Sequence, residues 1–179
     1  FHPNGTKIYL ARIIPFRGEY YKLQSNMNNI VKHLIYPIPD PELPFLGIHL
    51  TRMIDGTITV GPNAVLGFKR EGYGRYNFNL KDVAEMLSFK GFYKVISTNI
   101  ISGLKELLNS FHKASYLKQV QKYCPKIKLD DLEPYPAGIR AQAVLNDGTL
   151  VHDFLFTNSK RSIHVCNAPS PAATSAIPI

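Results

Sequence analysis

The chain has 179 residues, of which 45% are hydrophobic and 19% are charged, and its formal net charge is +8. This length suits one globular domain or one large lobe of a bigger protein. No apolar stretch of the sequence approaches the roughly 20 residues that a membrane-spanning helix needs. The basic residues are scattered and lack the aromatic signatures of nucleic-acid-binding proteins, so we expect no nucleic-acid partner.

Strand-like patterns occupy most of the N-terminal part of the chain. Residues 7–23 contain two such runs around Pro15, and Gly18 lies where a backbone could approach a ligand closely. Residues 29–39 alternate and are rich in β-branched side chains, which predicts a further strand. Residues 37–44 hold four of the 13 prolines and therefore predict a rigid loop.

A hairpin follows, with strands over 45–53 and 57–61, because the dipeptide Asp55-Gly56 tolerates the positive φ that a tight turn needs. Helical spacing begins after Asn79, which is suited to be an N-cap. Further helices are predicted over residues 91–110 and 115–125.

The last third of the chain returns to strand patterns. A loop over 129–138 leads to a predicted strand over 137–145, and residues 150–156 are its predicted hairpin partner. One more strand is expected over 163–166. The order of sheet, helices and sheet predicts an α+β fold, with a mixed, mostly antiparallel sheet flanked by helices on one face.

The chain ends in CNAPSPAATSAIPI and begins with FHPNG, without an initiator Met, so we expect a piece of a longer protein. Pro169 or Pro171 is suited to begin a helix, whose unpaired N–H groups would face a flat or anionic ligand. Close packing of a helix on the sheet, without a ligand, explains the same small residues. Cys124 and Cys166 belong to no CxxC motif, which predicts free thiols in a reducing compartment.

Five blocks of the sequence, IIPFRGEYY, HLIYPIPDPELPFLGIHLTR, GPNAVLGFKREGY, PAGIRAQA and NAPSPAATSAIPI, resemble the L-2-hydroxyglutarate dehydrogenase (or oxidase) family. These are FAD-dependent flavoproteins of the D-amino-acid-oxidase-like superfamily. The resemblance implies oxidation of L-2-hydroxyglutarate to 2-oxoglutarate by hydride transfer to FAD. It also implies quinone or oxygen as electron acceptor, and a cytoplasmic enzyme, possibly peripheral on the inner membrane.

The resemblance covers only the C-terminal part of that family, because the GxGxxG fingerprint of the N-terminal dinucleotide-binding fold is absent. Residues 1–162 are then the substrate-binding lobe, and residues 163–179 are a strand and the start of the C-terminal flavin-contacting segment. We expect the chain to need the N-terminal FAD domain as its partner and to be inactive alone. Apolar surface left uncovered would favour a homo-oligomer.

The resemblance also assigns cofactor-binding and substrate-binding residues. Arg17 and Gly18 correspond to a segment near the flavin, and Arg140 corresponds to an arginine that binds the substrate carboxylate. Each arginine could instead be a strand residue without a ligand. The flavin-contacting loop consists of Asn167, Ala168, Pro169, Ser170, Pro171 and Ala172. The remaining substrate-binding candidates are Tyr36 and Asn63, which should roof the substrate, and Lys69 and Arg70, which could pair with its distal carboxylate or be exposed.

A base must remove the hydroxyl proton as hydride leaves the substrate. His49 and His164 are the candidates, because histidine titrates near neutral pH. Either could be a histidine in a sheet without a catalytic role, and the sequence does not choose between them. No metal site is predicted, since Asp130-Asp131 has no third ligand at a suitable spacing.

Two other functions fit parts of the pattern. A related flavoenzyme that oxidises an amino acid or glycerol phosphate would share the sheet and Arg140. A basic, non-enzymatic binding module would explain the net charge of +8, although the scattered basic residues disfavour it.

Overall fold

A computed structural model describes residues 11–38, 47–74, 76–169 and 172–178. The main sheet has the strand order β2-β3-β1-β4, and all three strand pairs are antiparallel. Its strands are β1 (Ala11–Leu23), β2 (His49–Arg52), β3 (Ile58–Leu66) and β4 (Leu132–Leu145). A separate two-stranded sheet consists of β5 (Leu155–Asn158) and β6 (Ile163–Asn167).

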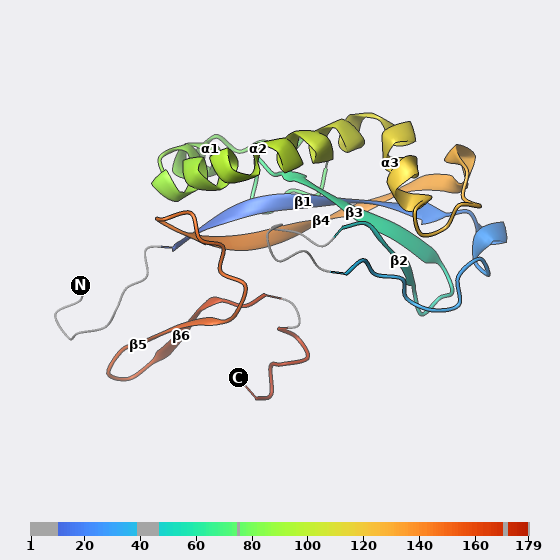
Figure 1. The fold of residues 1–179 in the computed structure, drawn as a ribbon. Coiled ribbons are helices and arrows are strands. Elements are labelled where there is room, and N and C mark those ends of the chain that lie inside the picture. Colours follow the sequence, from blue (N-terminus) through green and yellow to red (C-terminus); the bar gives the residue numbers. More distant parts are fainter. Residues whose placement is uncertain (1–10, 39–46, 75, 170–171, 179) are drawn as a thin grey trace.

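Three α-helices lie along one side of the main sheet (Figure 1). They are α1 (Leu80–Leu87), α2 (Lys90–Phe111) and α3 (Lys113–Val120), and two short 3₁₀ helices are η1 (Ser25–Met27) and η2 (Leu129–Asp131). Segment 31–38 and the β5–β6 hairpin lie on the other side (Figure 1). The α+β prediction, with a mostly antiparallel sheet and helices on one side, is confirmed.

The structure corrects the prediction of two short strands around Pro15, because β1 runs through the proline as one strand. Pairing with β3 ends at Phe16, which lies opposite Leu66. The N–H that proline lacks therefore falls where the β3 ladder stops, and the Pro15 carbonyl still accepts from the Gly67 N–H at 2.8 Å. A proline at the end of a ladder costs little pairing, which explains the continuous strand.

Two other predicted strands are wrong. Within segment 31–38, only Ile35 forms a bridge, to Leu50, so the expected strand over 29–39 is absent from the described residues there. The expected strand over 150–156 beside residues 137–145 is also absent: Leu150 makes a single bridge to Val144, and the strand found in this region, β5, pairs with β6 instead. Apart from residues 37–38, which lie in no regular element, the predicted loop over 37–44 lies outside the described residues.

The predicted loop over 129–138 is also corrected, because β4 begins at Leu132 and contains Pro134 and Pro136. β4 is an edge strand of the sheet, where a missing N–H leaves no ladder unpaired on the outer side. The expected helix at Pro169 or Pro171 is not seen: residues 172–178 form turns, beginning with a bond from the Ala172 N–H to the Pro169 carbonyl at 2.9 Å.

The hydrophobic core has two parts. In the first, the buried ring of Tyr116 on α3 packs against β1, β2 and β3, and its hydroxyl donates to the Val60 carbonyl at 2.9 Å. In the second, Ile14 and Phe16 of β1 pack against α1 and the first half of α2. The first cluster joins α3 to the sheet, and the second joins α1 and α2 to it.

Asn79 is the N-cap of α1, as predicted, because its side chain accepts a hydrogen bond from the Asp82 N–H at 3.0 Å. We expect Asn79→Ala to lower the free energy of unfolding by about 1 kcal/mol, since one N-terminal N–H loses its partner. Asn79→Asp keeps an acceptor and should cost less. Urea denaturation of the two variants checks this, and equal losses would contradict a capping role.

The second half of α2 carries a stripe of exposed apolar side chains. Ile100, Ile101, Leu104, Leu107, Leu108 and Phe111 are each between 44% and 81% exposed. Their spacing follows one face of a helix. Among the described residues, no helix is long and apolar enough to cross a membrane.

Candidate functional site

Alternation along β1 divides the residues around Gly18 between the two sides of the sheet. Successive strand residues point in opposite directions, so Gly18 and Tyr20 share one side while Arg17 and Glu19 share the other. The contacts agree, because Arg17 reaches toward α2 whereas Tyr20 lies near Tyr36. The side chain of Arg17 therefore does not join Gly18 in one contact surface.

On the Gly18 side, the backbone of β4 is open at Gly138. Gly18 of β1 lies directly opposite Gly138, and a Cβ at Gly138 would meet no atom within 4 Å. Gly18 itself is covered, because a Cβ there would lie 3.0 Å from Pro62 Cβ and 3.5 Å from the ring of Tyr20. Arg140 lies two residues beyond Gly138 on β4 and is exposed.

Tyr36 and His49 stack near Tyr20. Their ring centroids are 4.3 Å apart, and the Tyr36 hydroxyl lies 3.4 Å from Thr51 Oγ1. His49 pairs across the ladder with Gly61, against whose backbone Tyr20 packs. His49 Nδ1 lies 3.3 Å from the Gly47 carbonyl oxygen. Partial burial lowers the pKa of His49, and the bond to Gly47 opposes this with a smaller effect.

Electrostatics link Tyr20 to Arg140 as well. Burial raises the pKa of Tyr20, the nearby Tyr36 raises it further, and the Arg140 guanidinium lowers it to a smaller extent. Tyr20 therefore lies within electrostatic reach of both residues. We call Tyr20, Tyr36, His49 and Arg140, with Gly18 and Gly138, the Tyr20 surface.

Sequence reasoning named Gly18, Tyr36, His49 and Arg140 of this surface and missed Tyr20 and Gly138. The sequence FRGEYY contains two adjacent tyrosines, which point to opposite sides of a strand. The available signal was alternation, because Tyr20 is two residues from Gly18 and shares its side.

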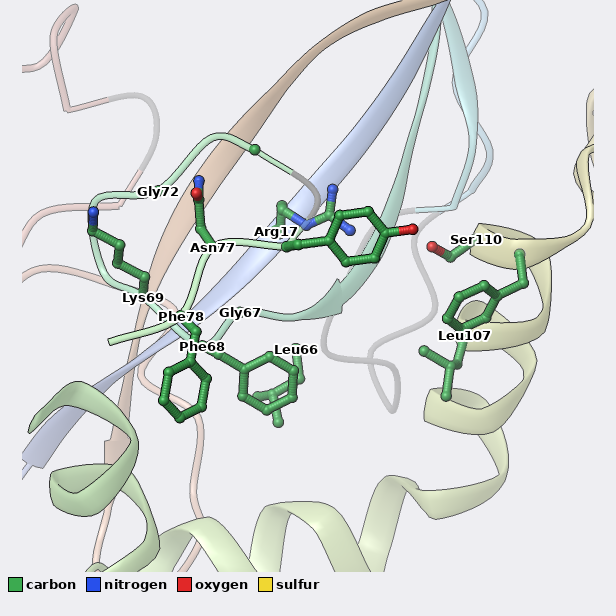
Figure 2. Close-up of a pocket in the computed structure, with 13 residues that line it drawn as sticks. Arg17, Leu66, Gly67, Phe68, Lys69, Gly72, Asn77, Phe78, Leu107 and Ser110 are labelled. Carbon is green, nitrogen blue, oxygen red and sulfur yellow. The ribbon is translucent and has the colours of Figure 1, made fainter. Parts of the chain in front are cut away.

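A cavity of about 290 Å³ lies between α2 and the loop after β3 (Figure 2). Arg17 and Lys69 line it together with aromatic and apolar side chains, among them Phe68, Phe78 and Leu107. The Arg17 guanidinium pairs with the Glu19 carboxylate, and the two side chains are only 11% and 15% exposed. This cavity thus unites two predicted site residues on the side of β1 opposite Tyr20.

Asn63 and Arg70 hold helices in place. The buried Asn63 amide donates to the Glu106 carbonyl of α2 at 2.9 Å and to Glu19 Oε2 at 3.3 Å. Arg70 pairs with Glu85 at 2.7 Å and Asp82 at 3.6 Å, both on α1. Neither residue shares the contacts of the Tyr20 surface.

The β5–β6 hairpin carries the other candidate base and the start of the predicted flavin loop. His164 is exposed on β6, with Nε2 at 3.1 Å from Ser162 Oγ. The Asn167 amide donates to the carbonyls of Asp153 (2.8 Å) and Val151 (3.3 Å), which anchors the end of β6. Ala168 is exposed in the loop that follows. Ser170 and Pro171 lie outside the described residues.

The hairpin and the Tyr20 surface are not joined by the cavity beside α2, which neither Arg140 nor residues 167–169 line. In the part of the chain that the structure describes, no group of three metal-ligating side chains is present. Cys124 is a buried free thiol and Cys166 an exposed one.

Comparisons with known proteins identify the family to which this chain is similar. Residues 4–179 match the protein family described as FAD dependent oxidoreductase. The L-2-hydroxyglutarate dehydrogenase of Escherichia coli (strain K12) is 62% identical over 167 residues, which are 93% of this chain and 40% of that protein. The enzyme of that name from Indibacter alkaliphilus is 49% identical over 169 residues (94% and 42%).

A mitochondrial L-2-hydroxyglutarate dehydrogenase from Mus musculus is 44% identical over 173 residues, which are 94% of this chain and 37% of that protein. The chain thus spans about two-fifths of the length of these relatives. Because the family match extends over nearly all of its residues, the chain belongs to the FAD dependent oxidoreductase family.

Proposed function

We propose that the protein of which this chain forms part oxidises L-2-hydroxyglutarate to 2-oxoglutarate with FAD. The observation that carries the proposal is the grouping of Arg140, Tyr36 and His49 around Tyr20. Relatives that are 44–62% identical bear the name of that activity. The finer assignments below extend the name to particular residues of this chain.

FAD fits the Tyr20 surface because Gly138 leaves the backbone of β4 open to a flat ring. A Cβ at Gly138 would stand in empty space, so this opening is formed by the absence of a side chain. Gly138, with the backbone that follows β6 at Asn167, would hold the cofactor. When bound, FAD supplies the acceptor for the hydride that leaves C2 of the hydroxy acid.

Arg140 would hold the substrate carboxylate. A guanidinium presents two parallel N–H groups to a carboxylate, which fixes its orientation as well as its position. Gly138, two residues before Arg140 on β4, carries no side chain that would occupy the space for this contact. Tyr36 would close the substrate from the opposite side.

His49 is the better-placed base in this proposal. A carbonyl oxygen only accepts, so the bond to Gly47 puts the proton on His49 Nδ1 and leaves Nε2 able to accept one. Its lowered pKa keeps the ring neutral at pH 7, which a base requires. His164 has no contact with the Tyr20 surface among its described hydrogen bonds.

His49→Asn in the full-length enzyme should lower kcat by about 10²- to 10⁴-fold, the usual range for a lost general base. In the wild type, kcat/KM should fall as the pH drops through the lowered pKa, hence below 6.5, because the protonated ring accepts no proton. That acid limb should vanish in the variant. His164→Asn is the control; if it removes activity while His49→Asn does not, the assignment to His49 is wrong.

A substrate panel on the full-length protein tests the function itself. L-2-Hydroxyglutarate should be turned over, whereas glycine, sarcosine and glycerol 3-phosphate should not. Turnover of one of these instead would assign the related flavoenzyme activity. Absence of all turnover, together with steeply salt-dependent binding of nucleic acid, would favour a basic binding module.

The electron acceptor and location belong to the same proposal. By resemblance, electrons pass to a quinone or to oxygen, and the enzyme is cytoplasmic with peripheral contact to the inner membrane. The segment that completes the FAD site belongs to the part of the relatives that this chain does not cover.

A further inference from the structure

We propose that the outward face of α2, together with aromatic residues of the segment between β3 and α1, binds the surface of an anionic phospholipid bilayer. This inference rests on the peripheral membrane contact in the proposed function, for which it names the surface, and it is independent of the proposed reaction. Its first support is the stripe of exposed apolar side chains on the second half of α2, from Ile100 to Phe111.

Aromatic side chains from a distant part of the sequence extend this stripe. Leu107 and Phe111 of the stripe line the cavity beside α2. Three exposed aromatic residues line the same cavity: Phe68, Tyr76 and Phe78. Figure 2 shows Leu107 across the cavity from Phe68 and Phe78. We call the stripe and these three aromatic residues the α2 patch. Monomeric proteins rarely expose so large a contiguous apolar surface unless it binds a partner or a membrane.

The position of α2 suits contact with a flat surface. Figure 1 shows α2 lying along the main sheet, on the outside of the molecule. Its inward side is buried, as at Val95 and Asn109, whereas Ile101 on the outward side is 81% exposed. An amphipathic helix held in this way can lie in the plane of a membrane interface with its apolar face against the acyl chains. The exposed ring of Tyr76 suits the headgroup level, where tyrosine is enriched.

The charge of this part of the chain favours an anionic partner. Residues 86–128 contain eight lysines and one acidic residue, Glu106. All of these lysines except Lys113 are exposed. Glu106 is directed toward β3, where its Oε2 accepts from the Ala64 N–H at 3.3 Å, and burial raises its pKa. Anionic headgroups attract such lysines, whereas a second copy of this chain would bring like charges together. The charge therefore favours a bilayer over a homodimer as the occupant of the α2 patch.

Two isoleucines offer a matched pair of variants. Ile101 lies in the α2 patch, and Ile54 is fully exposed in the turn between β2 and β3, outside the patch. Ile101→Glu and Ile54→Glu therefore make the same change at two exposed positions, and neither disturbs the core. The double variant Lys94→Gln/Lys105→Gln removes two exposed charges of α2. Flavin absorbance and the thermal midpoint of each full-length holoenzyme variant verify folding.

The test measures partitioning of the full-length protein onto vesicles by sedimentation. One set of vesicles contains phosphatidylcholine and phosphatidylglycerol at a ratio of about 7:3, and the other contains phosphatidylcholine alone. The wild type should bind the anionic vesicles at least about tenfold more tightly. Ile101→Glu should weaken binding by about 10- to 100-fold, which corresponds to one inserted isoleucine side chain. Ile54→Glu should change nothing, and the double lysine variant should lose affinity for the anionic vesicles only.

A wild-type protein that binds neither set of vesicles would overturn the inference, because the rest of the protein then covers the α2 patch. Equal binding to the two sets, or equal losses in Ile101→Glu and Ile54→Glu, would overturn it as well. Light scattering that finds a wild-type dimer and an Ile101→Glu monomer, with vesicle binding unchanged, would assign the patch to a second copy instead.

Turnover of L-2-hydroxyglutarate with a water-soluble dye as electron acceptor separates this inference from the proposed reaction. The wild type and Ile101→Glu should turn over equally with the dye, because the α2 patch lies away from the Tyr20 surface. Vesicle binding without turnover would leave the inference standing while the proposed reaction fails. Turnover without vesicle binding would do the reverse.

Discussion

Arg140→Lys in the full-length protein should lower kcat/KM for L-2-hydroxyglutarate by about 10- to 100-fold. Lysine keeps the charge but presents one ammonium, so the bidentate contact with the carboxylate is lost. A hydrogen bond to a charged group contributes about 1.5–3 kcal/mol, and each 1.4 kcal/mol is a factor of ten. We expect the loss mainly in KM, because the carboxylate is bound before the reaction begins.

Arg70→Lys is the matched control for Arg140→Lys. Arg70 pairs with Asp82 and Glu85 on α1, away from the Tyr20 surface. Steady-state kinetics of both variants should show a large loss for Arg140→Lys and less than about a twofold change for Arg70→Lys, because partly exposed ion pairs contribute little. Similar losses in the two variants would contradict the assignment of the carboxylate to Arg140.

Gly61→Ala should lower the free energy of unfolding by about 2–4 kcal/mol. Gly61 has φ +146°, a conformation that residues with a Cβ adopt only with strain of about 1–3 kcal/mol. The new Cβ would also lie 2.8 Å from the Glu19 carbonyl oxygen and 2.7 Å from the Tyr20 ring. Relief of that crowding requires movement of β1 or of Tyr20, and overpacking adds to the cost.

The control for Gly61→Ala is Gly103→Ala on α2. A Cβ at Gly103 would meet no atom within 4 Å, and alanine is the better helix former, so stability should rise by about 0.5–1 kcal/mol. Urea denaturation of the two variants in the full-length protein should therefore move in opposite directions. A Gly61→Ala variant as stable as the wild type would show that neither the positive φ nor the Tyr20 contact is required.

Local sequence patterns predicted those parts of the fold whose conformation depends on neighbouring residues in the chain. Asn79 is the N-cap of α1, and Gly56 forms the predicted tight turn with φ of +85°. The wrong predictions concern segments whose conformation depends on their place in the sheet. Pro134 suggested a loop, yet it lies in an edge strand that does not need its N–H. The β-branched residues at 30–31 suggested a strand, but segment 31–38 gains only one bridge to β2.

The residue types of the candidate site could be predicted better than the side of the sheet that each side chain faces. Arg140, Tyr36 and His49 were identified because their side chains suit a carboxylate and a proton transfer. Arg17 lies on the other side of β1 from Tyr20, and that division depends on strand register. Asn63 was expected near the substrate but is buried against α2, where its amide bonds to the helix backbone. Such partners come from distant parts of the chain, so no local pattern indicates them.

A crystal structure of the full-length holoenzyme with 2-oxoglutarate would test most directly whether the Tyr20 surface is the substrate site. We expect one carboxylate of the bound product on the Arg140 guanidinium, with its C2 facing the flavin and His49. Product bound instead in the cavity beside α2, on Arg17 and Lys69 and away from Arg140, would contradict this assignment.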